Sequence, residues 1–180
     1  MSALSDAAAG IGAGEAAVEF EQVFHLHYER VARTIGRIVR DPARAEELAV
    51  EVFWKLWRKP EALGDDVGGW LYRTGVRAAL YDLRREARRA RYHRLFPFLA
   101  GPATPEQTHA AAEESAHVRG VLAGMNARQA ELLLLRGDDL SYRQVAEALG
   151  LNPASVGTLL SRAQQAFRKE YLKHYGEPRR

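Results

Sequence analysis

The sequence predicts an all-α protein built of two small helical domains joined by a flexible linker, with a helix-turn-helix in the second domain. Three observations lead to this prediction. Apolar residues recur at three- and four-residue spacing along most of the 180 residues, and the alternation typical of strands is nowhere sustained. The stretch 97–105 holds three prolines and a glycine and interrupts the helical pattern. The stretch 141–162 has capping residues at two helix starts and a glycine between them, as two closely crossing helices require.

The N-terminal part is expected to consist of a tail followed by helices. Residues 1–14 are rich in Ala, Gly and Ser and are expected to form a flexible tail. The apolar spacing then predicts a helix from about Glu15 to Arg40. Asp41-Pro42 is expected to start the next helix, because Asp caps free N–H groups and Pro suits the first helical position. Lys59-Pro60 is expected to end that helix.

A third helix and a linker complete the first half. A loop from Gly64 to Gly69 leads to a helix from Trp70 to about Arg94, apolar in its first half and strongly basic in its second. The first domain is therefore placed at residues 15–95 and the linker at residues 96–112. Within the linker, Thr104 to Gln107 has the pattern of a capping box, which predicts the start of another helix.

The second domain, at residues 113–177, is predicted to hold the helix that Thr104 starts and three more. Gly137 and Gly150 are expected to close two of them, and Gly150 suits the left-handed turn that follows a helix. The last three helices are predicted over Asn126–Arg136, Ser141–Leu149 and Asn152 to about His174.

The last two of these helices form the predicted helix-turn-helix. Ser141 and Gln144 are spaced as a capping box, and Asn152-Pro153 caps and starts the second helix. The buried faces are predicted to be Val145, Ala146 and Leu149 on the first helix, and Val156, Leu160, Ala163 and Phe167 on the second. The outward side chains are predicted to be Ala154, Ser155, Thr158, Ser161, Arg162 and Gln165. The alternative is a tight helical hairpin in an ordinary core.

Such a motif inserts the N-terminal part of its second helix into the major groove of DNA. Arg162 could then bond to a guanine edge or to phosphate, while Arg143, Arg168 and Lys169 are expected to contact phosphate. The charge distribution agrees, because the basic residues are concentrated in two stretches. Residues 67–100 carry eight basic and two acidic side chains, and residues 141–180 carry seven and three. This pattern indicates two nucleic-acid contacts and an acidic face for another partner.

The amino-acid composition excludes several other classes of protein. The chain has no cysteine, which rules out disulfides and thiolate metal sites and fits a reducing cytoplasm. The start of the chain lacks the basic and apolar segments of a signal peptide, and the apolar runs are far shorter than the ~20 residues of a membrane span. We therefore expect a cytoplasmic protein without membrane insertion.

Taken together, the motifs resemble those of the bacterial extracytoplasmic-function (ECF) sigma factors, small two-domain subunits that give RNA polymerase its promoter specificity. The resemblance covers about Phe20 to Tyr171, and the order and spacing of the motifs are more specific than any one of them. The motifs are Ala45–Trp57, Trp70–Arg73, Leu80–Arg85, Leu140–Gly150 and Ser155–Arg162. The resemblance implies partners: core RNA polymerase through its β′ clamp and β flap, promoter DNA, and an anti-sigma factor that occludes the binding surfaces.

The resemblance assigns the second helix to polymerase binding. Its acidic face is Glu46, Glu47 and Glu51, with Leu48 and Phe53 supporting it. Glu47 and Glu51 are four residues apart and share one helical face. Without the resemblance, a solvated acidic face would be the ordinary interpretation.

The resemblance assigns the third helix to the minus-ten promoter element and to strand opening, for which aromatic rings offer stacking surfaces to unpaired bases. The implied contacts are Trp70, Tyr72, Arg73, Arg77, Tyr81, Arg84, Arg85 and Arg88. Trp54, Trp57 and Trp70 also suit a hydrophobic core. The chain departs from the family pattern at three places. Val50 stands where the family usually has Gln, Arg77 where Asn is common, and Tyr81-Asp82 where Asp comes one position earlier.

The helix-turn-helix is by resemblance the reader of the minus-thirty-five element. The implied contacts are Arg143, Pro153, Ala154, Ser155, Thr158, Arg162, Gln165 and Lys169.

Two other functions are open at this stage. One is a helix-turn-helix regulator that acts without polymerase, and the other is a helical hydrolase that uses Glu46, Glu47 and Glu51 as acid, base or metal ligands. Against the hydrolase, no His lies three or four residues from these glutamates, and the sequence has no Gly-rich phosphate loop. We therefore expect no enzyme activity, no metal and no cofactor.

Overall fold

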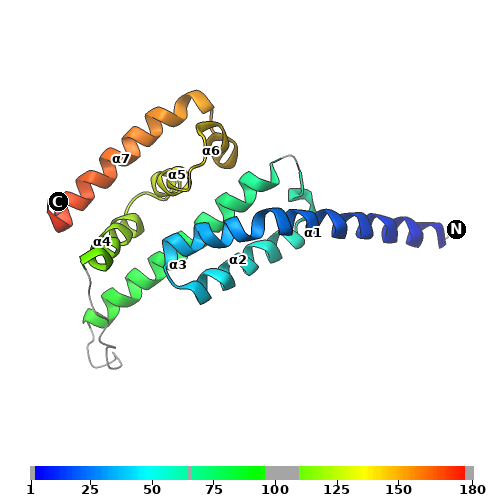
Figure 1. Ribbon diagram of the computed structural model, residues 1–180, viewed down its shortest axis with the longest axis horizontal. Coiled ribbons are helices and arrows are strands. Elements are labelled where there is room, and N and C mark those ends of the chain that lie inside the picture. The colour runs from blue at the N-terminus through cyan, green and yellow to red at the C-terminus, as the bar shows by residue number, and fades with distance from the viewer. Residues whose placement is uncertain (1–2, 65, 96–109, 177–180) are drawn as a thin grey trace.

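A computed structural model describes residues 3–64, 66–95 and 110–176. Over these residues the chain forms seven α-helices and one short 3-10 helix, and no strand (Figure 1). The elements are α1 (Ala3–Val39), α2 (Pro42–Trp57), η1 (Pro60–Ala62), α3 (Val67–Leu95), α4 (Ala110–Gly124), α5 (Ala127–Gly137), α6 (Tyr142–Leu149) and α7 (Pro153–Tyr175). The predicted all-helical fold is confirmed, and no helix among these residues is long and apolar enough to cross a bilayer.

The N-terminal half is a bundle of α1, α2 and α3. Among its most buried residues are Ile35 of α1, Val52 and Leu56 of α2, and Leu71 and Val76 of α3. The Asp41 carboxylate accepts a hydrogen bond from the backbone N–H of Arg44 at 3.1 Å, so the predicted cap of α2 is confirmed.

Two helix starts differ from the predictions in this half. Residues 3–14 were expected to be a flexible tail, but they continue α1, which begins at Ala3. Alanine has the highest intrinsic helix propensity, and this stretch is rich in it. α3 begins at Val67 rather than Trp70, because the turn closes early with a hydrogen bond from the Val67 N–H to the Gly64 carbonyl at 3.0 Å.

The C-terminal half consists of α4 to α7, with α7 packed against α4, α5 and α6. The side chain of Asn126 caps α5, accepting from the N–H groups of Arg128 and Gln129, so this helix begins one residue later than predicted. The predicted capping box at Thr104 to Gln107 and most of the predicted linker lie outside the described residues.

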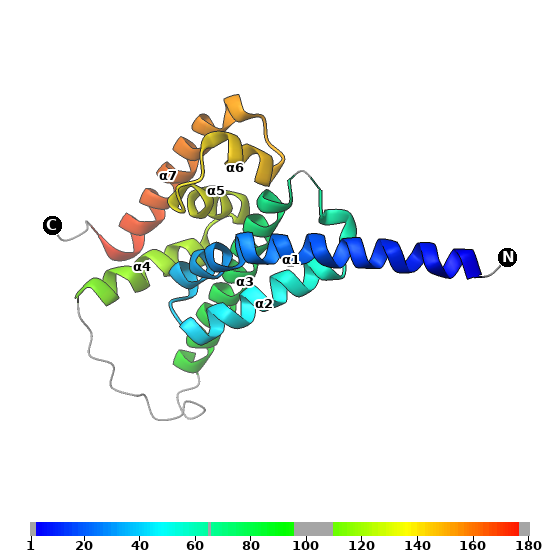
Figure 2. The same cartoon turned by 45° about the vertical axis from the view of Figure 1, so that its right-hand side comes forward.

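The two halves are in direct contact. α3 packs on α1 and α2 on one side and on α4, α5 and α6 on the other, and both views show it running between the halves (Figures 1 and 2). The buried side chains of both halves belong to one hydrophobic cluster. The sequence predicts two units with a linker and contains no sign of this contact.

Candidate nucleic-acid and partner interfaces

The helix-turn-helix is built as predicted. The Ser141 hydroxyl accepts from the Gln144 N–H, and the Gln144 side chain accepts from the Ser141 N–H, so the capping box is complete. Gly150 ends α6 in the left-handed conformation, with φ 61° and ψ 46°. Asn152 then caps α7 by accepting from the Ala154 N–H at 2.9 Å. These local bonds fix the turn, and thereby the direction in which α7 leaves it.

The buried faces of α6 and α7 match the sequence pattern, except that Phe167 is only half-buried. Val145, Ala146, Leu149, Val156, Leu160 and Ala163 are buried. The candidate DNA contacts are exposed: Arg143, Pro153, Ala154, Ser155, Thr158, Arg162, Gln165 and Lys169. On α7, positions 154, 158, 162, 165 and 169 follow each other at three- or four-residue steps and therefore share one face. The start of α7 thus presents a polar and basic strip to solvent.

The second candidate surface lies along α3, and its residues differ in accessibility. Tyr81 is 66 % exposed, and Arg85 and Arg88 are exposed as well, while Trp70 is half-buried at the helix start. Tyr72 is 7 % exposed and does not lie on this surface.

Tyr72 packs under α1. The guanidinium of Arg30 lies 5.0 Å from the centre of its ring, and its hydroxyl is 3.4 Å from Nδ1 of His27. Burial raises the pKa of the Tyr72 hydroxyl. The expected stacking of Tyr72 on a base is therefore incompatible with this packing, because the aromatic face is already covered from α1.

Three arginines of α3 are bonded to the C-terminal half. Arg77 donates from Nε and Nη2 to the two carboxylate oxygens of Glu131 on α5, at 2.9 and 3.2 Å. Arg73 donates to the backbone carbonyl of Ala148 near the end of α6, at 2.8 Å. Arg84 donates to the carbonyls of Ala123 and Met125 at the end of α4, at 3.2 and 3.0 Å. Arg73, Arg77 and Arg84 are thus engaged within the molecule, although the Arg77 side chain is still 51 % exposed.

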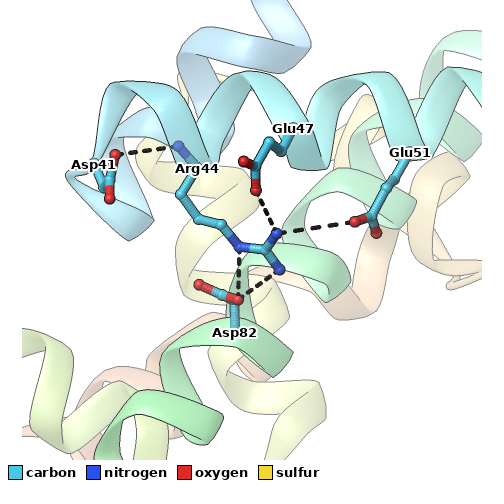
Figure 3. Close-up of polar contacts among 5 residues, drawn as sticks. All are labelled: Asp41, Arg44, Glu47, Glu51 and Asp82. Atoms are coloured by element: carbon cyan, nitrogen blue, oxygen red, sulfur yellow. Dashed lines mark hydrogen bonds and ion pairs between the residues drawn. The ribbon is translucent and has the colours of Figure 1, made fainter.

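The third candidate surface is the acidic face of α2. Glu46, Glu47 and Glu51 are exposed, whereas Leu48 and Phe53 are 3 % and 2 % exposed and support the face from below. Figure 3 shows the carboxylates of Glu47 and Glu51 directed at the guanidinium of Arg44. Nη1 of Arg44 lies 2.8 Å from Glu47 and 3.9 Å from Glu51, which agrees with the expectation that these two glutamates share a helical face.

Arg44 also joins this face to α3 (Figure 3). Its Nε and Nη2 atoms donate to one oxygen of the buried Asp82 carboxylate, at 3.0 and 2.8 Å. The hydrogen bonds to Asp82 and then to Glu47 raise the pKa of Arg44 above its usual range. Sequence reasoning missed this contact, because Arg44 and Asp82 are 38 positions apart. The one signal available was an aspartate among the apolar residues of α3.

Beside the acidic residues, α2 carries an apolar strip. Val50, Trp54 and Trp57 are 55 %, 60 % and 47 % exposed. They lie at i, i+4 and i+7, which places them on one face. The alternative of a core position thus does not hold for Trp54 and holds only in part for Trp57, whose ring contacts Phe20 with ring centres 5.0 Å apart. The outward side of α2 combines carboxylates with apolar side chains.

Nothing in the described part of the chain assembles a reaction centre on these glutamates. No group of three or more His, Asp or Glu side chains there is placed to hold a metal ion. The pKa of His27 is lowered by burial and by the nearby Arg30, and this side chain lies against α3 rather than α2.

Comparison with known proteins identifies the family. The model of sigma-70 region 2 matches residues 23–89, and the model of sigma-70 region 4 matches residues 117–166. The chain is 29 % identical over 153 residues to the ECF RNA polymerase sigma factor SigK of Mycolicibacterium vanbaalenii, covering 78 % of this chain and 75 % of that protein. It is 28 % identical over 169 residues to the ECF RNA polymerase sigma factor SigL of Mycobacterium tuberculosis, covering 88 % and 92 %.

The chain is an extracytoplasmic-function sigma factor.

Among solved structures, this sigma factor aligns with the sigma factor RpoE of Bartonella quintana, determined in complex with the anti-sigma factor NepR. That alignment has a TM-score of 0.48 and 21 % identity and covers 87 % of this chain and 98 % of the other.

Family membership separates the three surfaces of this sigma factor. Region 2 contains the acidic face of α2 and the α3 surface, and region 4 contains the helix-turn-helix. Membership also makes the protein a transcription initiation factor.

Proposed function

We propose that this sigma factor binds core RNA polymerase through the outward side of α2 and reads a promoter with two separate surfaces, the start of α7 and the α3 helix. The observation that supports this division most directly is the separation of charge. The outward side of α2 carries a cluster of exposed carboxylates, Glu46, Glu47 and Glu51, whereas the second half of α3 and much of α7 carry mainly basic exposed side chains. One acidic and two basic surfaces suit a protein that binds a large partner and DNA at the same time.

The α2 surface is proposed to fit a basic, partly apolar site on the β′ clamp. Glu46, Glu47 and Glu51 would steer and orient the contact, and Trp54 and Trp57 would bury apolar area at its centre. Large aromatic side chains carry a disproportionate share of binding energy at protein interfaces. The two tryptophans are an addition to the contacts implied by the resemblance.

The two DNA surfaces are proposed to act on different promoter elements. The start of α7, with Ser155, Thr158 and Arg162, would enter the major groove at the minus-thirty-five element. On α3, Arg85 and Arg88 would contact phosphates of the minus-ten element, and Trp70 and Tyr81 would stack on unpaired bases. The β flap is the proposed polymerase contact of the C-terminal half, and an anti-sigma factor is the proposed inhibitor. We place this activity in the cytoplasm, where the polymerase acts.

The decisive experiment is reconstituted transcription with core RNA polymerase and a library of promoter sequences. We expect the purified chain to bind core polymerase and to enrich promoters with two conserved elements. A chain that binds specific DNA as a dimer and does not associate with polymerase would instead be a regulator acting on its own, and the proposal would be wrong.

The α2 surface is tested by reversing its charge. Glu47→Lys combined with Glu51→Lys should weaken core binding at least tenfold, because two steering carboxylates become repulsive toward a basic site. The matched control is Glu61→Lys combined with Glu113→Lys, which makes the same change in net charge at two exposed glutamates of η1 and α4 outside this surface. Equal loss in both variants would show that overall charge, and not this surface, controls the binding.

A further inference from the structure

A pocket that takes no part in the proposed contacts lies between the end of α1 and the helices α4 and α5. Its volume is about 490 Å³. Pockets that hold small organic ligands have volumes of about 300–1,000 Å³. None of the residues that line it belongs to the surfaces proposed to bind polymerase or DNA. The pocket is therefore a candidate site for a further ligand.

The most buried residues that line the pocket are apolar. Ile38 of α1 and Leu122 of α4 are 5 % and 7 % exposed, and Val118 of α4 and Leu134 of α5 are half-buried beside them. All four side chains belong to the hydrophobic cluster or pack against it. A hydrocarbon group placed here would leave water, which favours its binding.

The charged side chains that line the pocket are mainly basic. They are Arg37, Arg40, Glu114 and Arg119. Arg37 is paired with the buried carboxylate of Asp138, whereas Arg40 donates to the uncharged hydroxyl of Ser115. Within the described part of the chain, no carboxylate lies at ion-pair distance from Arg40 or Arg119. The lining therefore carries positive charge that the described residues do not neutralise.

Arg119 carries the most specific signal in the pocket. Its side chain is half-buried, yet it makes no hydrogen bond, ion pair or ring contact with any other described residue. A charged group that loses part of its hydration is ordinarily paired, because burying an unpaired charge is unfavourable. The planar guanidinium has five N–H donors, two of which match the oxygens of a carboxylate. Arg119 thus offers an unused anion-binding group beside apolar side chains.

We infer that this pocket binds a small organic anion that has an apolar body and one carboxylate group. The apolar body lies against Ile38, Val118 and Leu122, and the carboxylate bonds to Arg119 and Arg40. An uncharged ligand would leave the arginines unpaired, and an inorganic anion would leave the apolar side chains uncovered. This inference is independent of the proposed function, since the two share no residue.

The binding of three probes to the full chain tests the inference by isothermal titration calorimetry. Decanoate has both the apolar body and the carboxylate, decan-1-ol lacks the charge, and inorganic phosphate lacks the apolar body. We expect decanoate, below its micelle concentration, to saturate one site. It should bind at least about tenfold more tightly than either of the other two, because only decanoate satisfies both parts of the pocket.

Two variants assign the binding to this pocket. Arg119→Gln should weaken decanoate binding about tenfold, because the carboxylate loses its charged partner, and should leave decan-1-ol binding unchanged. Val118→Asn should weaken the binding of both probes, because it places an amide on the apolar wall. The matched control for charge is Arg168→Gln, at an exposed arginine of α7 outside the pocket, which should change decanoate affinity less than about twofold.

Decanoate should also raise the melting temperature of the wild type more than that of Arg119→Gln, since a ligand that binds only the folded chain stabilises it. If Val118→Asn fails to fold, Arg119→Gln decides, because it removes a charge that has no partner among the described residues. Absence of saturable decanoate binding, or equal losses in Arg119→Gln and Arg168→Gln, would overturn the inference. Binding of a synthetic amphipathic helix of leucine and glutamate, without binding of decanoate, would overturn it in favour of a protein partner.

Discussion

The α7 and α3 surfaces are both basic, and both are proposed to contact DNA, yet the molecule presents them differently. Thr158 and Arg162 of α7 are exposed, on a helix whose direction is fixed by bonds within a few residues of the turn. On α3, Arg77 and Arg84 are bonded to side chains and carbonyls of the other half. Charge in the sequence therefore indicates candidate DNA contacts, but tertiary contacts decide whether those side chains are available.

The largest effect is expected at the contact that holds α3 on α2. Arg44→Ala leaves the buried carboxylate of Asp82 without its guanidinium partner, which should lower the free energy of unfolding by about 3 kcal/mol. Urea denaturation followed by circular dichroism measures it. The control is Arg33→Ala, which removes an exposed pair with Glu29 within α1 and should cost no more than about 0.5 kcal/mol. Similar losses in both variants would mean that α3 does not depend on this bond.

The second-largest effect is expected when the proposed DNA surface of α7 is compared with that of α3. Arg162→Ala should weaken binding of the free chain to a duplex carrying the minus-thirty-five element by about 2 kcal/mol, or about thirtyfold. Arg77→Ala should change the same affinity by less than about twofold, because Arg77 is already bonded within the molecule. Fluorescence anisotropy measures both. If Arg77→Ala were the more damaging change, the distinction between an available and an engaged surface would be lost.

A smaller effect tests how the α7 surface is oriented. Gly150 has φ 61°, and an alanine side chain in this conformation costs about 1–2 kcal/mol. Gly150→Ala should therefore lower the melting temperature and weaken binding to the minus-thirty-five element together. Gly137→Ala is the matched control, since Gly137 ends α5 without a positive φ and has open space around it. A stable Gly150→Ala variant would show that the turn does not require the left-handed residue.

The smallest effect concerns His27 of α1, which lies against the first turns of α3. The pKa of His27 is lowered by burial, so the unfolded chain takes up its proton at a higher pH than the folded chain. This contribution to stability is fully present above the unfolded pKa of about 6.5 and declines as the pH falls below it. Denaturation midpoints at pH 7.5 and pH 5.5 should converge in His27→Gln relative to the wild type. His174→Gln, an exposed histidine, should leave the difference unchanged.

The features predicted correctly from the sequence are those set by nearby residues. Asp41, Ser141 with Gln144, and Asn152 all cap helices as expected, and Gly150 adopts the expected left-handed turn. Each depends on bonds that span two or three residues, so the local pattern contains the whole cause. The apolar stripes of α6 and α7 were predictable for the same reason, because helical geometry alone decides which positions share a face.

The features missed depend on partners far away in the chain. Arg77 and Glu131 are 54 positions apart, and Thr34 and Asp138 are 104 apart. No local pattern shows that such residues meet. The same limit explains the aromatic side chains, since Tyr72 and Trp54 both lie on amphipathic helices, and only the packing of α1 decides that Tyr72 is covered and Trp54 is not.

The hydrophobic cluster that runs through both halves sets a condition on any rearrangement. Separating the two halves would expose to solvent apolar side chains that are buried in the structure, and this exposure is unfavourable. A chain with separated halves and no bound partner would therefore close again quickly or aggregate. The separated arrangement should persist only while a large partner covers the apolar surfaces that separation exposes. RNA polymerase is the partner expected to do so.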